Sequence, residues 1–240
     1  FKIIFWWEWA HRFLGRFIGI SFLLPLIYFT IKLNLKKLST LYFIFFLICF
    51  QGFLGWYMVS SGLVDRIDVS HYRLSIHLLM AFIILSLIYW NYLKLKNLNI
   101  SREINNYLTF FFVFLIFFQI VIGAFVSGMD AGQIYNSWPL MGNNYFPDDN
   151  EIKNLFNINA FNDPSLVQFI HRNLAYLILF VYLIIFFQVY YNKLNNSKVS
   201  INVIGFLLIL QIVLGILTIL NGAQIYIASM HQISSIFLVI

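Results

Sequence analysis

The chain has 240 residues, of which 61% are hydrophobic and only 10% are charged. A soluble domain has about half of its residues apolar and about a quarter charged, so the composition excludes a soluble globular protein. The formal net charge of +6 does not indicate nucleic-acid binding, because the Lys and Arg residues of a membrane protein gather in its cytoplasmic loops. The single cysteine, Cys49, cannot form an internal disulfide.

Runs of about 20 apolar residues are long enough to cross a bilayer as helices. Seven such runs follow one another, near residues 10–31, 40–60, 72–92, 108–127, 168–191, 200–220 and 226–240. They predict an all-α polytopic membrane protein. Because the chain opens on Phe1 and stops inside an apolar run, we interpret it as part of a longer protein.

The charges between these runs predict the orientation of the helices. Three alternate connections carry eight basic residues: Lys32, Lys36, Lys37, Lys94, Lys96, Arg102, Lys193 and Lys198. The other three carry only Arg66 and Lys153. This difference places the first set in the cytoplasm and the segment 128–167 outside. The part of that segment from 130 to 147 is rich in aromatic residues, Gly and Pro. It favours an ordered cap, with a solvated connector as the alternative.

The chain also resembles itself at an offset of 160 residues. Residues 8–15 align with 168–175, and Gln51-x-x-x-Gly55 aligns with Gln211-x-x-x-Gly215. A third such element, Gln119-x-x-x-Gly123, opens the second half.

The repeat predicts a parent protein of eight spans, arranged as two tandem four-helix repeats, of which seven spans are visible. Residues 1–92 would form the N-terminal repeat without its first span. Residues 107–240 would form the C-terminal four-helix repeat, with the external loop 128–167.

Two histidines fall in each half, His11 and His77 in the first and His171 and His231 in the second. In the predicted orientation all four lie near the outer end of a span. Ionisable side chains in spans are rare and are functional candidates by default. Pairs of neutral imidazoles on facing helices suit the axial ligation of haem iron. His71 has no repeat partner and is predicted to lie in a loop, so it is left out.

Small and basic residues accompany the four histidines. The residue four positions after each histidine is small: Gly15, Ala81, Ala175 and Ser235. Such residues leave room for a flat macrocycle, or simply allow close helix packing. Arginines lie within a turn of three of the histidines: Arg12, Arg73 and Arg172. They could pair with haem propionates, or extend toward lipid headgroups.

The two halves differ at one polar position. Glu8 lies three residues before His11, whereas its repeat counterpart is Gln168. A carboxyl group beside a haem could take or give protons near neutral pH; alternatively, Glu8 orients His11 or stabilises a helix start. The first reading predicts a reacting site in the first half and a more permanent cofactor site in the second.

Several motifs together resemble a known family. They are Glu8-x-x-His11-Arg12, Ser60-Ser61-Gly62-Leu63, Arg73-Leu74-x-x-His77, Gly128-Met-Asp-Ala-Gly132, Tyr135-Asn-Ser-Trp-Pro-Leu-Met-Gly142, Gln168-x-x-His171-Arg172, Gln211-x-x-Leu214-Gly215 and His231-Gln232. The chain is similar over essentially its whole length to haem A synthases of the type found in α-proteobacteria and mitochondria. The motif at 135–142 is the most specific part of the resemblance.

The resemblance implies an oxidoreductase of the bacterial or mitochondrial inner membrane that serves cytochrome oxidase assembly. Such enzymes oxidise the C8 methyl of haem O to a formyl group by successive hydroxylations, giving haem A. Carried over, His171 and His231 would ligate a haem b cofactor, His11 and His77 would ligate haem O, and Glu8 would be the catalytic acid. Haem O synthase, an electron acceptor and a homo-oligomer partner are further expectations. The alternatives are a di-haem electron-transfer cytochrome and a proton-relaying transporter.

Overall fold

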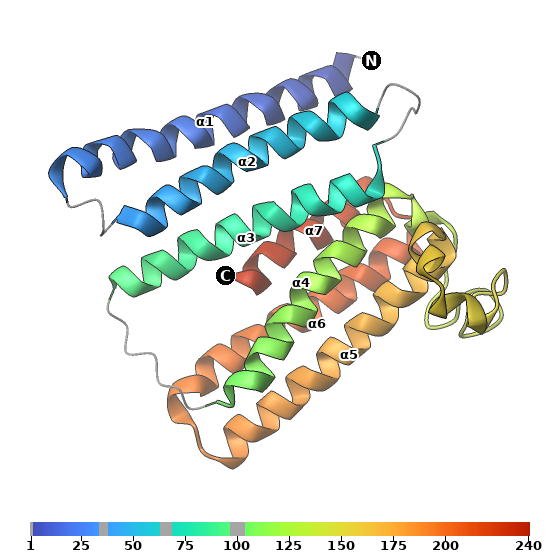
Figure 1. The fold of residues 1–240 in the computed structure, drawn as a ribbon. Coiled ribbons are helices and arrows are strands. Elements are labelled where there is room, and N and C mark those ends of the chain that lie inside the picture. Colours follow the sequence, from blue (N-terminus) through green and yellow to red (C-terminus); the bar gives the residue numbers. More distant parts are fainter. Residues whose placement is uncertain (1, 34–37, 63–68, 97–103) are drawn as a thin grey trace. The chain divides into compact units, whose positions relative to one another are not determined.

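The structure, a computed structural model, describes residues 2–33, 38–62, 69–96 and 104–240. Within these ranges it contains seven α-helices and no β-strand (Figure 1). The helices are α1 (Lys2–Lys32), α2 (Ser39–Gly62), α3 (His71–Leu95), α4 (Asn106–Gly128), α5 (Pro164–Tyr191), α6 (Lys198–Leu220) and α7 (Ile225–Val239). The predicted all-α class is therefore confirmed.

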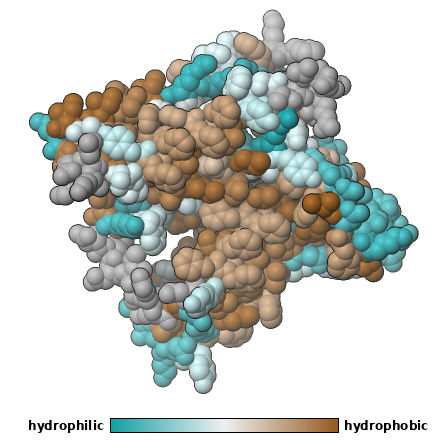
Figure 2. Space-filling view, viewed as in Figure 1, coloured by the Kyte–Doolittle hydropathy of each residue, from teal (hydrophilic) through white to brown (hydrophobic). Residues whose placement is uncertain are grey.

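The helices have the length and apolar character of membrane spans. Six of those described, α1 to α6, are long and apolar enough to cross a bilayer, and α7 is a shorter apolar helix. Their apolar side chains are largely exposed, and hydrophilic side chains gather at helix ends and in the connection between α4 and α5 (Figure 2). A surface of this kind is stable against lipid rather than water. The chain is a multi-pass membrane protein.

Three helix starts differ from the prediction. Helix α1 begins at Lys2 rather than near residue 10. Helix α5 begins at Pro164 rather than near residue 168, because Asp163 caps it by accepting a hydrogen bond from the amide of Leu166. His71, which the sequence analysis places in a loop, is the first residue of α3. Its ring packs edge-on against Phe125, with 5.1 Å between ring centroids.

The chain divides into two compact units, Phe1–Asp68 with Met80–Asn97, and Val69–Leu79 with Leu98–Ile240. In the first unit, Ile44, Leu47 and Ile84 form a small buried cluster. In the second, fourteen buried residues of α4, α5 and α6 form a larger core. Helix α3 contributes to both units, so the units do not coincide with the predicted repeats. The division into repeats at 1–92 and 107–240 stays a prediction.

Residues 129–163, called here the long loop, join α4 to α5. They contain three short 3₁₀ helices: η2 (Ala131–Gln133), η3 (Ile152–Phe156) and η4 (Ile158–Asn162). Met141 and Asn144 pair in an isolated β-bridge. The segment is an ordered structure rather than a solvated connector, as the sequence analysis expects of its first part.

The predicted orientation rests partly on residues that the structure does not cover. Lys36, Lys37, Arg66 and Arg102 lie outside the described residues, as does Leu63 of the Ser60–Leu63 motif. The placement of the long loop outside the cell membrane stays a prediction.

Candidate functional site

His171 lies in the second turn of α5, beside α4. A Cβ atom added to Gly123 of α4 would lie 3.1 Å from Cε1 of the His171 ring. Gln119, one turn earlier on α4, places its Nε2 3.3 Å from Nε2 of His171 and donates a hydrogen bond to the His171 carbonyl oxygen at 3.1 Å. The ring therefore packs closely on the backbone of α4, at a position where a side chain larger than that of glycine would push against it.

His231, on α7, meets α6 in the same way. A Cβ added to Gly215 of α6 would lie 3.2 Å from Cε1 of the His231 ring. Gln211, one turn earlier, donates from Nε2 to the hydroxyl of Ser234, which in turn donates to the His231 carbonyl. His171 and His231 both belong to the second compact unit. This unit thus contains the two histidines that the sequence analysis assigns to the cofactor.

Gln168 and Arg172 connect the same turn of α5 to the long loop. Gln168 Nε2 and Arg172 Nη2 both donate to the carbonyl oxygen of Tyr135, at 3.0 and 3.1 Å. Arg172 Nη1 donates to the carbonyls of Ser137 at 2.9 Å and Leu140 at 3.3 Å. Both side chains are buried, at 1% and 7% exposure. Among the described residues, Oε1 of Gln168 and Nε of Arg172 have no hydrogen-bond partner. The contact of Arg172 with a haem propionate stays a prediction.

Further contacts fix the loop along the helices. The indole of Trp138 donates to the hydroxyl of Tyr176 at 3.0 Å, and the hydroxyl of Tyr145 donates to Asn173 at 2.6 Å. Asn136 donates to the carbonyl of Ile219 at the end of α6. The motif at 135–142 therefore joins the loop to α5, next to His171, and to α6.

Acidic residues hold the loop together internally. The carboxylate of Asp149 accepts hydrogen bonds from the hydroxyls of Ser165 at 2.6 Å and Tyr135 at 2.9 Å, and from Asn150. Burial by itself raises the pKa of Asp149, but these hydrogen bonds outweigh it and lower that pKa. Burial, together with the bond to Asp149, raises the pKa of Tyr135, so its hydroxyl remains a donor.

Glu8, His11 and Arg12 lie on α1, in the first unit. Arg12 Nη2 donates to Glu8 Oε2 at 2.6 Å, and both side chains are more than half exposed. The repeat counterparts of this pair, Gln168 and Arg172, instead hold the long loop. The predicted asymmetry between the halves therefore extends from residue type to the contacts that the residues make.

The remaining predicted residues of the first half lie on α3. Arg73 and His77 are its third and seventh residues, and both belong to the second unit. His231 is likewise the seventh residue of α7. His11 and His77 thus belong to different units, and their pairing stays a prediction. The Cβ space beside Gly15 is open, with no neighbouring atom within 4 Å among those described.

Comparison with known proteins identifies the family. The family described as cytochrome oxidase assembly protein, COX15-CtaA, matches residues 1–240. The heme A synthase of Pelagibacter ubique is 47% identical over 239 residues, which cover 98% of this chain and 70% of that protein. Those of Rickettsia bellii and Flavobacterium johnsoniae are 42% and 38% identical, each over 99% of this chain and 73% and 72% of their own.

The chain belongs to the haem A synthase family. The structure adds to the family resemblance a set of residues that the sequence analysis did not assign to the site: Gln119, Gly123, Gln211 and Gly215. The repeated Gln-x-x-x-Gly pattern was the signal that could have found them, since residues four apart share a helix face.

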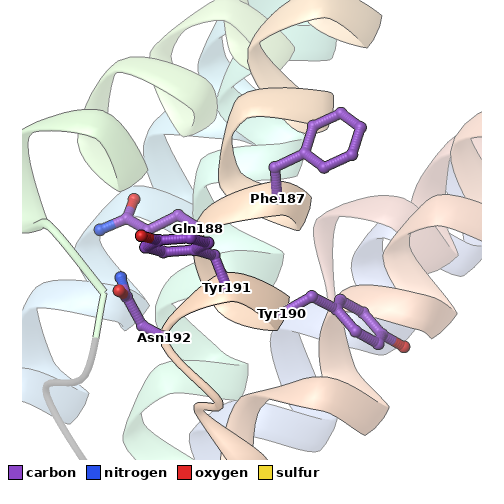
Figure 3. A pocket seen from close by; sticks show the side chains of 5 residues that line it. All are labelled: Phe187, Gln188, Tyr190, Tyr191 and Asn192. Carbon is purple, nitrogen blue, oxygen red and sulfur yellow. The ribbon is translucent and has the colours of Figure 1, made fainter.

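One surface depression lies away from the predicted site residues. It lies at the far end of α5 and is lined by Phe187, Gln188, Tyr190, Tyr191 and Asn192 (Figure 3). It contains none of the predicted site residues and lies about 24 Å from His171, at about 1.5 Å per helical residue. Exposed aromatic side chains at a helix end are typical of the membrane interface.

Proposed function

We propose that this protein is a haem A synthase, an oxidoreductase that converts haem O to haem A by oxidising the C8 methyl to a formyl group in two hydroxylations. The observation that carries the proposal is the family match over the whole chain. It is supported by the pair of histidines in the second unit, each resting on a glycine of the preceding helix.

We infer that His171 and His231 would hold the haem b cofactor. The Nδ1 atom of each ring is shielded from solvent and has no hydrogen-bond partner among the described residues. Buried polar atoms of this kind normally have a partner, so each ring has an unused capacity for a further polar contact. Neutral imidazoles are suitable axial ligands. When bound, haem supplies electron transfer; the chain contributes ligation and a fixed ring orientation.

The substrate site is assigned to the first half of the sequence. His11 and His77 would hold haem O, and Glu8, one helical turn from His11, would hold or pass a proton during oxidation. The ion pair with Arg12 keeps the Glu8 carboxylate beside that turn of α1. Arg12 and Arg73 would contact the propionates. Gln168 cannot replace Glu8 in this role because an amide does not exchange protons near neutral pH.

The location and partners follow from the same proposal. Six candidate spans suit the inner membrane of a bacterial cell or mitochondrion, with the lipid bilayer around the helices. The substrate would come from haem O synthase, and an electron acceptor and homo-oligomer formation are further expectations.

The experiment is to purify the full-length protein from cells that make haem O but no other haem A synthase, and to identify extracted haems by mass spectrometry. Wild type should yield haem b with haem A or its hydroxylated intermediate. Glu8→Gln should yield haem b and haem O only. Glu151→Gln, which changes an exposed glutamate paired with Lys153 in the long loop, is the matched control and should behave like wild type.

Two results would contradict the proposal. Haem b alone in wild type and both variants would indicate an electron-transfer cytochrome. The absence of any haem would remove the basis for a haem enzyme and favour a transporter.

A further inference from the structure

The Gln-x-x-x-Gly element occurs on α4 and on α6, and in both cases it faces a histidine of the helix that follows. Gln and Gly four residues apart lie on one helix face. The two glycines meet the two rings at almost the same place, 3.1 Å from Cε1 of His171 and 3.2 Å from Cε1 of His231. Two independent copies of one arrangement indicate a common role rather than chance packing.

The glutamine of α4 acts directly on the imidazole. Its Nε2 donates to the carbonyl oxygen of His171. A carbonyl can only accept, so this contact fixes which end of the amide faces His171. The same Nε2 lies 3.3 Å from Nε2 of His171, which must then be the accepting nitrogen. Gln119 therefore holds the His171 turn at two points, the backbone carbonyl and the ring, in the haem-free protein.

The glutamine of α6 acts through a relay. Gln211 donates at 2.6 Å to the hydroxyl of Ser234, which donates at 3.1 Å to the carbonyl of His231. This contact fixes the backbone turn that carries the ring rather than the ring itself. The two seats are therefore alike at their glycines and different at their glutamines.

We propose that these elements are histidine seats, which orient the rings of His171 and His231 in the protein before haem enters. Gly123 and Gly215 give each ring its place against a helix backbone, Gln119 holds the ring and carbonyl of His171, and Gln211 fixes the His231 turn through Ser234. The four are positioning residues, and their link to haem b rests on the proposed function.

The close contact between each glycine and its histidine ring makes the ring position sensitive to any added side chain. A Cβ at Gly123 or Gly215 would force the ring to move by a few tenths of an ångström, and the larger side chain of valine would displace it further. Residues that orient metal-ligating histidines typically change metal affinity by about 10- to 100-fold when they are removed. We expect a comparable loss of haem retention.

The glycine test compares Gly123→Val and Gly215→Val with Gly19→Val, in full-length protein in detergent. Gly19 has no atom within 4 Å of the Cβ position among those described. Haem b content and the low-spin signal in electron paramagnetic resonance are measured. The seat variants should retain about 10-fold less haem or shift that signal, and Gly19→Val should match wild type. Equal effects in all three, or none in either seat variant, would overturn the proposal.

The glutamine test separates the seat from the haem assignment. Nitrogen-15 magnetic resonance of histidine in haem-free protein should show Nδ1 of His171 protonated and Nε2 accepting. Gln119→Leu should alter this pattern. Gln188→Leu, about 25 Å along α5 at about 1.5 Å per residue, and Gln211→Leu should leave it unchanged. An unchanged pattern in Gln119→Leu would overturn the seat. A changed pattern in a protein that binds no haem b would support the seat and contradict the proposed cofactor.

Discussion

Arg172 donates a hydrogen bond to the carbonyl oxygen of Tyr135 across 3.1 Å, from the residue that directly follows His171. The same carbonyl accepts from Gln168. A loop of 35 residues is thereby attached to the turn of α5 that carries one proposed haem ligand. Motion of the loop and orientation of that turn are coupled through a buried guanidinium group, which has few alternative partners once it is desolvated.

Arg172→Met should release the long loop from α5. The substitution removes hydrogen bonds from a charged group to three backbone carbonyls, and each such bond contributes roughly 1.5–3 kcal/mol. Because methionine also removes the cost of burying a charge, part of this contribution is offset. We expect a net loss of about 2–3 kcal/mol in the free energy of unfolding and faster proteolysis within 131–162. Arg12→Met, which breaks only the exposed pair with Glu8, should cost less than about 1 kcal/mol. Equal losses of stability in the two variants would contradict the role of Arg172 in holding the long loop on α5.

Gln168→Glu should destabilise the fold far more than Glu8→Gln, the reverse substitution at the counterpart position of the first half. A glutamate at this buried position would place a carboxylate against the carbonyl of Tyr135 and remove the donor. Glu8→Gln, on an exposed face, should leave the thermal unfolding temperature unchanged. Unfolding of the two purified variants in the same detergent measures the difference. A stable Gln168→Glu protein would show that the carbonyl contact contributes little.

Gly142→Ala should destabilise the loop more than Gly222→Ala. Both glycines have positive φ, of 78° and 62°, so each substitution costs about 1–2 kcal/mol of backbone strain. At Gly142 the new Cβ would also collide with the carboxylate of Asp148, whereas the space at Gly222 is open. Proteolysis of the loop and thermal unfolding should therefore separate the two variants. Identical behaviour would mean that the Asp148 side chain moves away without cost.

Acid should loosen the long loop through Asp149. Its pKa is lowered in the folded protein, so its contribution is fully present above the unfolded value of about 3.9. That contribution is lost as the pH falls through the lower folded value. Hydrogen exchange of amides 135–150 should accelerate below about pH 4. In Asp149→Asn, exchange should already be faster at neutral pH, and this acid-dependent step should be missing. A step that persists in the variant would assign it to another group.

His171→Ala should lose haem b, whereas His71→Ala should retain it. His71 lies in the same unit and is packed against Phe125 and Gly128, but it does not share the glycine seats of α4 and α6. Haem b content by pyridine haemochrome, with unfolding temperature as a check on folding, distinguishes the two. Retention in His171→Ala with loss in His71→Ala would exchange the roles of these histidines.

The helices and the four histidines were predictable because their signals are local. Apolar runs of span length allow only helices in a bilayer, since every backbone polar group needs an internal partner. An ionisable residue within such a run is conspicuous for the same reason. The internal repeat then divided the histidines into two pairs. It also showed Glu8 and Gln168 to be different, without any knowledge of which residues they contact.

The contacts were not predictable in the same way because they join segments far apart in sequence. Gln119 lies 52 residues from His171, and Tyr135 lies 37 from Arg172. The sequence analysis places His71 in a loop because helix ends carry weak local signals. In the structure His71 is the first residue of α3, and its ring packs on Phe125 of α4.

Sequence by itself determined the fold class, the number of visible helices, the family and the candidate ligands. Tertiary structure alone decided that Gly123 and Gly215 support the rings of His171 and His231, and that Arg172 holds the long loop. The physical reason is that the role of a glycine or a buried guanidinium depends on which distant residue packs against it. The residue type by itself shows only which contacts are possible at that position.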